Sequence, residues 1–183
     1  NIDWSEVKAI MDLRLLFCTI MTPHNSQTLH RRSIRLPGYD YTQSGAYFVT
    51  LCTWQGECLF GEVVAGEMML SAAGKIANEQ WARLARRFVE GDFSLYVIMP
   101  NHVHGIVILD GGGRGAGEEF QSHDPRNAPL RPYAGPHVVP GSLGAIIRAY
   151  KSSVSYRIHA MHGCNVAPVW QRNYYEHIIR NDE

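Results

Sequence analysis

Two histidines separated by one residue carry the strongest chemical signal in this sequence. His102 and His104 flank Val103 within MPNHVHGIV at 99–107, which predicts the end of one strand, a short turn and the start of another strand. Residues two apart in a strand point to the same face of a sheet, so the imidazoles project together while Val103 points into a core. Two imidazoles on a rigid strand supply half of a divalent-metal site. The ordinary alternative is a pair of surface or hydrogen-bonded histidines.

Three further blocks accompany the histidine pair in a fixed order. They are RRSIRLPGYDY at 31–41 with GAYFVT at 45–50, ECLFG at 57–61, and WQRNYYEHIIR at 170–180. Together with PNHVHG, they make the region from Leu29 to Glu183 resemble the single-tyrosine transposases with a His-hydrophobic-His (HUH) motif, most closely the REP-associated tyrosine transposases. The resemblance implies a metal-dependent endonuclease and strand transferase that acts on single-stranded or hairpin DNA and works as a monomer or homodimer.

The resemblance also assigns roles to the histidine pair. In this family a tyrosine attacks a DNA phosphodiester and keeps the 5′ phosphate covalently, while a metal ion offsets charge on the phosphate oxygens. His102 and His104 are the implied metal ligands, and Mg²⁺ or Mn²⁺ is the expected cofactor. Imidazole suits Mn²⁺ better than Mg²⁺, which favours oxygen ligands. A third protein ligand is expected, and Glu176 and His177 of the last block are candidates to position the metal or DNA, with His177 the candidate third ligand.

The catalytic tyrosine is where this sequence departs from the family pattern. In relatives it lies on a helix after the last block, and this chain stops at Glu183, where that helix is expected to begin. No tyrosine matches the family position; Tyr174 and Tyr175 are nearest, and Tyr175 is the fallback nucleophile. Adjacent strand residues face opposite ways, so one of the two is expected in the core and the other against substrate. A catalytically incomplete protein that binds DNA hairpins is therefore the alternative function.

Basic and aromatic side chains near these blocks are candidates for contact with DNA. The expected phosphate contacts are Arg31, Arg32, Arg35, Lys151, Arg172 and Arg180. The candidates for stacking on unpaired bases are Tyr39, Tyr41 and Trp170. The alternative for each is an exposed charge or a core aromatic. The remaining histidines are expected to be solvated or lightly structural: His24, His30, His123, His137, His159 and His162.

Bulk composition limits the class of protein. The chain has 183 residues, 45% of them hydrophobic, with 17 basic and 17 acidic residues, which predicts one globular domain with no overall affinity for polyanions. Four cysteines without Cys-x-x-Cys spacing indicate a reduced, cytoplasmic protein. No apolar run approaches the roughly 20 residues of a membrane span. A metal hydrolase of another class is a third alternative, but His-x-His-x-Asp-His and His-Glu-x-x-His motifs are absent.

The spacing of apolar residues predicts the elements that hold the histidines. Strands are expected at 46–53, 59–64, 93–99, 102–109 and 170–179, and helices at 71–88, capped by Ser71, and at 142–161. This order predicts an α+β fold in which an antiparallel sheet carries helices on one face. The resemblance implies a ferredoxin-like HUH core with the histidines on a central strand. Residues 1–28 are interpreted as an atypical N-terminal extension, and the transposase-like domain is expected to span 29–183. Within it, 111–141 is expected to be a flexible Gly/Pro-rich loop.

Overall fold

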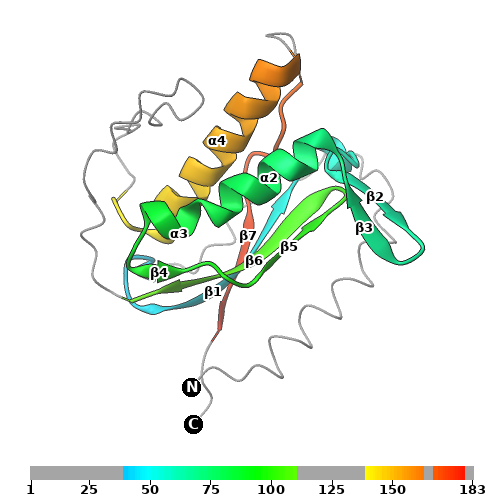
Figure 1. The fold of residues 1–183 in the computed structure, drawn as a ribbon. Coiled ribbons are helices and arrows are strands. Elements are labelled where there is room, and N and C mark those ends of the chain that lie inside the picture. Colours follow the sequence, from blue (N-terminus) through cyan, green and yellow to red (C-terminus); the bar gives the residue numbers. More distant parts are fainter. Residues whose placement is uncertain (1–38, 111–138, 163–166, 180–183) are drawn as a thin grey trace, which may run out of the picture.

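A five-stranded antiparallel sheet and the helices on one of its faces make up the structure, a computed structural model that describes residues 39–110, 139–162 and 167–179 (Figure 1). The strands are β1 (Gly45–Cys52), β2 (Gly61–Val64), β3 (Glu67–Leu70), β4 (Gly91–Asp92), β5 (Tyr96–Met99), β6 (His102–Leu109) and β7 (Tyr175–Ile179). The helices are α2 (Ala72–Ala82), α3 (Leu84–Arg87) and α4 (Leu143–His162), with a 3-10 turn at Trp54–Gly56.

The histidine strand β6 lies inside the sheet. It pairs antiparallel with β1 on one side and with β4 and β5 on the other, and β1 pairs in turn with β7. The succession β1–α2–β5–β6–α4–β7 is the β-α-β-β-α-β arrangement of ferredoxin-like folds. The predicted α+β class, the antiparallel sheet and the central position of the histidine strand are confirmed.

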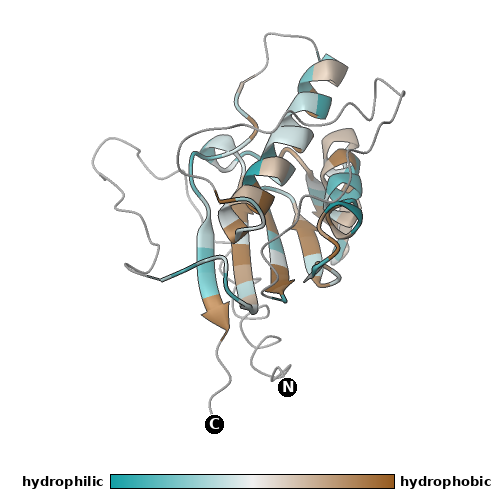
Figure 2. Cartoon of the chain, turned by 90° about the vertical axis from the view of Figure 1, so that its left-hand side faces the viewer, coloured by the Kyte–Doolittle hydropathy of each residue, from teal (hydrophilic) through white to brown (hydrophobic). Residues whose placement is uncertain are grey.

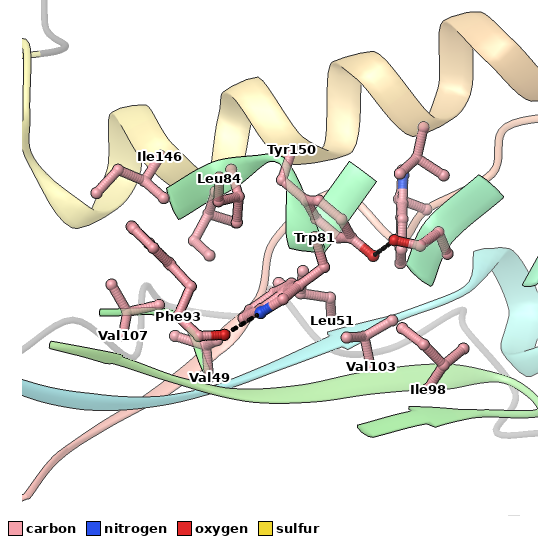
Figure 3. Close-up of a cluster of buried hydrophobic side chains, with 14 of the residues drawn as sticks. Val49, Leu51, Trp81, Leu84, Phe93, Ile98, Val103, Val107, Ile146 and Tyr150 are labelled. Carbon is pink, nitrogen blue, oxygen red and sulfur yellow. Dashed lines mark hydrogen bonds between the residues drawn. The ribbon is translucent and has the colours of Figure 1, made fainter. Parts of the chain in front are cut away.

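Helices α2 and α4 cover one face of the sheet, and the hydrophobic core lies beneath them (Figures 1 and 3). The strands carry most of the hydrophobic colour in Figure 2, whereas the two long helices alternate between hydrophobic and hydrophilic. Trp81 of α2 is fully buried, and its Nε1 donates to the Phe93 carbonyl at 3.0 Å. Tyr150 of α4 donates its hydroxyl to the Ala77 carbonyl at 3.1 Å, which ties the two helices together.

Gly105, one residue after the histidine pair, is required by this packing. A Cβ added at Gly105 would overlap the indole ring of Trp81. The absence of a side chain therefore lets the indole lie directly on β6, from the face opposite to the histidines.

Several predicted elements agree with the structure. Ser71 caps α2 as expected, with its Oγ accepting from the Gly74 amide at 3.0 Å. Helix α4 matches the predicted helix at 142–161 to within one residue at each end, and the turn between β5 and β6 joins an antiparallel hairpin. No helix within the described ranges is long and apolar enough to cross a membrane.

Other predicted elements need correction. The strand expected at 59–64 is the shorter β2, and it forms a separate hairpin with β3, a strand that was not predicted. The helix expected at 71–88 is divided at Arg83 into α2 and α3. The strand expected at 93–99 begins at Tyr96, because the Ser94 amide donates to the Asp92 side chain in a local turn. The last strand, β7, covers only the second half of 170–179. The predicted extension at 1–28 lies outside the described residues, as does the predicted loop except for 139–141.

Candidate functional site

His102 and His104 share the face of the sheet that is turned away from the helices. Their ring centroids are 4.4 Å apart and their planes meet at 69°. Val103, between them, is fully buried in the core beneath the helices, as predicted from strand alternation. Both imidazoles are themselves buried, with exposed fractions of 6% for His102 and 3% for His104. The pair therefore places two buried imidazoles side by side on the central strand, where they are candidate nitrogen donors for a metal ion.

Side chains next to each ring determine which nitrogen carries the proton. Nδ1 of His102 lies 2.7 Å from Oδ1 of Asn101, and Nδ2 of Asn101 donates to the Gly56 carbonyl at 3.2 Å. Because the Gly56 carbonyl fixes the amide orientation, Oδ1 is the acceptor and His102 donates from Nδ1. This assignment leaves Nε2 of His102 unprotonated, which is the form of imidazole that binds a metal.

His104 has a hydroxyl partner in the same role. Its Nδ1 lies 2.9 Å from Oγ1 of Thr50, which stands directly opposite it on β1. A hydroxyl can accept this proton, so His104 can also present Nε2 as its unprotonated nitrogen. The ring further lies against Phe48, with centroids 5.2 Å apart, so both its hydrogen bond and its packing restrict its rotation.

Burial lowers the pKa of His102 to about 4. The cause is desolvation, which disfavours the charged imidazolium. His102 is therefore neutral near pH 7, as a metal ligand must be.

The register of the sheet shows which other side chains share the histidine face. Directly opposed residues in antiparallel strands point to the same face. Tyr175 of β7 opposes Thr50, and Thr50 opposes His104, so these three form one row across three strands. Cys52 opposes His102 in the neighbouring row.

The same register separates the candidates in the last sequence block. His177 opposes Phe48 and lies on the histidine face, whereas Glu176 opposes Val49 and points to the helix-covered face. Tyr174 packs against the core, so the expectation that one of the adjacent tyrosines is structural fits Tyr174, and Tyr175 is the one on the histidine face.

The third metal ligand is not found among the described residues. Within residues 39–110, 139–162 and 167–179, no three His, Cys, Asp or Glu side chains are grouped so that they could hold a metal ion. His177 thus does not form a complete set with the pair in this structure. The donor chemistry of the pair itself, two imidazoles whose Nδ1 atoms each lie within hydrogen-bond distance of a neighbouring side chain, fits Mn²⁺.

The structure describes only two of the six basic residues that were predicted to contact DNA. Four of the six basic residues lie outside the described ranges: Arg31, Arg32, Arg35 and Arg180. Arg172 is exposed, and its contact with phosphate stays a prediction. Lys151 is half-buried and donates to backbone carbonyls of Gln171 and Asn173.

The aromatic candidates also differ from one another. Trp170 is buried between Phe60 and Tyr150, which agrees with the alternative that it is a core aromatic and not a platform for stacking on bases. Tyr39 and Tyr41 are half-buried and make an edge-to-face contact, with ring centroids 4.9 Å apart.

Sequence reasoning missed Thr50 and Asn101 as supports of the histidine pair. Asn101 directly precedes His102, so the sequence already suggested that its side-chain amide could hydrogen-bond the imidazole. Thr50 is 54 positions from His104, and its role follows only from the pairing of β1 with β6.

No model of a known protein family matches this chain. An uncharacterized protein of Haemophilus influenzae is 36% identical over 165 residues, which cover 88% of this chain and 86% of that protein.

Two solved structures are also similar at a distance. A REP-associated tyrosine transposase bound to a REP hairpin has a TM-score of 0.43 and 17% identity; the match covers 85% of this chain and spans only 64% of that chain. A candidate transposase of Deinococcus radiodurans R1 has a TM-score of 0.38 and 15% identity, over 78% of this chain and 82% of that one.

Proposed function

The chain belongs to the same family as the Haemophilus influenzae protein, and we propose that it is a metal-dependent, transposase-type endonuclease and strand transferase acting on single-stranded or hairpin DNA. The observation that carries this proposal is the pair His102 and His104, with rings 4.4 Å apart on one face of a central strand and each Nδ1 engaged by a neighbouring side chain. The order of the sequence blocks around the pair supports the same assignment. Its proposed place of action is the cytoplasm.

The protein's own groups would perform three tasks. His102 and His104 would hold the cation through Nε2, while Asn101 and Thr50 keep both rings in the ligating tautomer. When bound, Mn²⁺ or Mg²⁺ supplies Lewis-acid stabilisation of the non-bridging phosphate oxygens. Because the pair is buried, the negative charge of the phosphate would be met in a site with little competing water.

The described residues do not form a complete catalytic site, so the nucleophile is proposed from the chemistry that the reaction requires. The hydroxyl oxygen of a tyrosine forms a bond to phosphorus as it gives up its proton, and the bond from phosphorus to the 3′ oxygen breaks as that oxygen takes up a proton. The fallback for this role is Tyr175, which lies on the histidine face in the row of Thr50 and His104.

A hairpin binder without catalysis is the second candidate. It is favoured by the donor set, because no third His, Cys, Asp or Glu joins the pair among the residues that the structure describes. The two candidates differ in what happens when a ligand histidine is removed: a nuclease loses cleavage, whereas a hairpin binder keeps its affinity.

The test uses the full 183-residue chain and an end-labelled DNA hairpin with single-stranded flanks, in Mn²⁺, in Mg²⁺ and in excess chelator. We expect cleavage and a covalent protein–DNA adduct in either metal, and neither in chelator. His102→Ala and His104→Ala should lose both products, and His162→Ala, at the exposed end of α4, is the matched control. Hairpin affinity that survives His102→Ala, with no adduct in any lane of the wild type, would favour the binding protein.

A further inference from the structure

Lys151 and Trp170 hold each other in a reciprocal contact between α4 and the segment before β7. Nζ of Lys151 donates to the Gln171 carbonyl at 2.6 Å and to the Asn173 carbonyl at 3.2 Å. The ammonium also lies 6.0 Å from the centroid of the Trp170 ring. In return, Nε1 of Trp170 donates to the Lys151 carbonyl at 3.1 Å.

The same segment is fixed on its other side to the end of β1. The Gln171 amide donates to the Cys52 carbonyl at 3.0 Å, and the Trp54 amide donates to the Val169 carbonyl at 2.9 Å. Trp170 forms an isolated bridge with Thr53. The chain from 169 to 173 is thus held between α4 and β1 immediately before it enters the sheet.

The register of strand β7 is tied to the position of residues 169–173, through which the chain enters the sheet. It has five residues and, among the described strands, a single neighbour, β1. A slip of one residue in a strand moves every side chain to the other face of the sheet. The row that joins Tyr175, Thr50 and His104 exists only in the observed register.

We propose that Lys151 is a positioning residue that sets the register of β7 through the Gln171 and Asn173 carbonyls, and so places Tyr175 and His177 on the histidine face. A lysine suits this task because its ammonium offers several donors to carbonyls that lie outside the sheet ladder. The effect on DNA cleavage rests on the function proposed above, whereas the effect on β7 does not. Lys151 thereby acts through the backbone instead of through the DNA phosphate predicted from the sequence.

The experiment measures the placement of β7 directly. Hydrogen exchange of residues 174–179 is followed at constant pH in the full chain, and a 4-fluorophenylalanine in place of Tyr175 reports its surroundings by fluorine NMR. In Lys151→Met we expect roughly tenfold faster exchange in this segment and a shifted fluorine signal. Lys151→Arg should restore both, because a guanidinium can also donate to two carbonyls and stack on an indole.

Two controls separate positioning from general effects. Arg172→Met removes an exposed cation from the same turn and should leave the exchange and fluorine signals unchanged. Ser152→Ala changes an exposed neighbour on α4 and should leave DNA cleavage unchanged. If wild-type cleavage is absent while Lys151→Met still loosens β7, the proposed function fails and the positioning role stands.

An unchanged exchange rate and fluorine signal in a folded Lys151→Met protein would overturn the proposal. If that variant does not fold, the wild type decides the matter by ¹⁵N NMR of the lysine ammonium. A slowly exchanging Lys151 signal, hydrogen-bonded to the carbonyls of residues 171 and 173, is expected. A freely rotating, rapidly exchanging ammonium would overturn the proposal.

Discussion

Thr50 stands directly opposite His104 across the β1–β6 ladder, with its Oγ1 2.9 Å from Nδ1 of the imidazole. The two residues are 54 positions apart in the sequence, and only the sheet brings them together. A hydroxyl that accepts from Nδ1 leaves Nε2 as the unprotonated nitrogen of the ring.

Thr50→Val should weaken metal binding while preserving the shape of the site. The substitution removes the hydrogen bond to His104, so the hydroxyl no longer holds the tautomer and the ring loses one of the contacts that restrict its rotation. We expect Mn²⁺ affinity to fall by about 10- to 100-fold, the usual loss for a supporting partner. Electron paramagnetic resonance of free Mn²⁺ would measure this, with Thr42→Val as the control. Equal affinity in Thr50→Val and wild type would contradict the role of the hydroxyl.

Gly105→Ala should destabilise the protein through the face opposite to the histidines. The added methyl group would overlap the Trp81 ring, which is fully buried and cannot move without disturbing the core. Overpacking of this kind costs about 1–3 kcal/mol. Urea unfolding measures the loss, and combining the substitution with Trp81→Phe should cost less than the sum of the two single changes. Strict additivity would show that the ring and the glycine do not constrain each other.

Ala65→Asn should stabilise the β2–β3 hairpin. Ala65 has a φ of 51° and Gly66 a φ of 85°, so both turn residues adopt the left-handed conformation. Asn tolerates this conformation better than Ala, and Asn-Gly is the preferred dipeptide of such turns. The expected gain is a few tenths of a kcal/mol, up to about 1 kcal/mol, in urea unfolding. A matched substitution at Glu67, Glu67→Gln, lies outside the turn and should not produce this gain.

The contribution of Lys151 to stability should depend on pH. Burial lowers its pKa from 10.5 to about 8, with a smaller opposing effect from Cys52. Between these two values the unfolded chain binds more protons at this site than the folded chain, so its contribution to stability rises with pH across this window.

The measurement compares urea unfolding of wild type and Lys151→Met at pH 7, 8, 9 and 10. Other titrating groups largely cancel in the difference, which should shift in favour of the wild type above pH 8. A constant difference from pH 7 to 10 would contradict the lowered pKa.

The sequence was sufficient for elements with strong local patterns. Helix α4 follows from its apolar spacing, and the hairpin of β5 and β6 from two β-rich runs separated by a short turn. The shared face of His102 and His104 follows from strand alternation alone.

Features that depend on distant pairing were not accessible in the same way. The β2–β3 hairpin was missed because Ala65–Gly66 is an uncommon turn dipeptide and three apolar side chains of the hairpin are exposed: Val63, Val64 and Met69. Which of Tyr174 and Tyr175 faces the histidines depends on the register between β7 and β1, whose paired residues are more than 100 positions apart. Strand alternation predicts that the two tyrosines point to opposite faces of the sheet, but it does not predict which of them faces the histidines.

Strand β6 is hydrogen-bonded along both edges, and its far face is pressed against an indole ring. A pair of ligands mounted on such a strand has little freedom to rearrange when an ion arrives. The reorganisation that a flexible loop would undergo on binding has already been completed during folding. A metal site built on this strand would be selective because it is rigid: an ion whose size or geometry does not suit the spacing of the two rings would bind with strain.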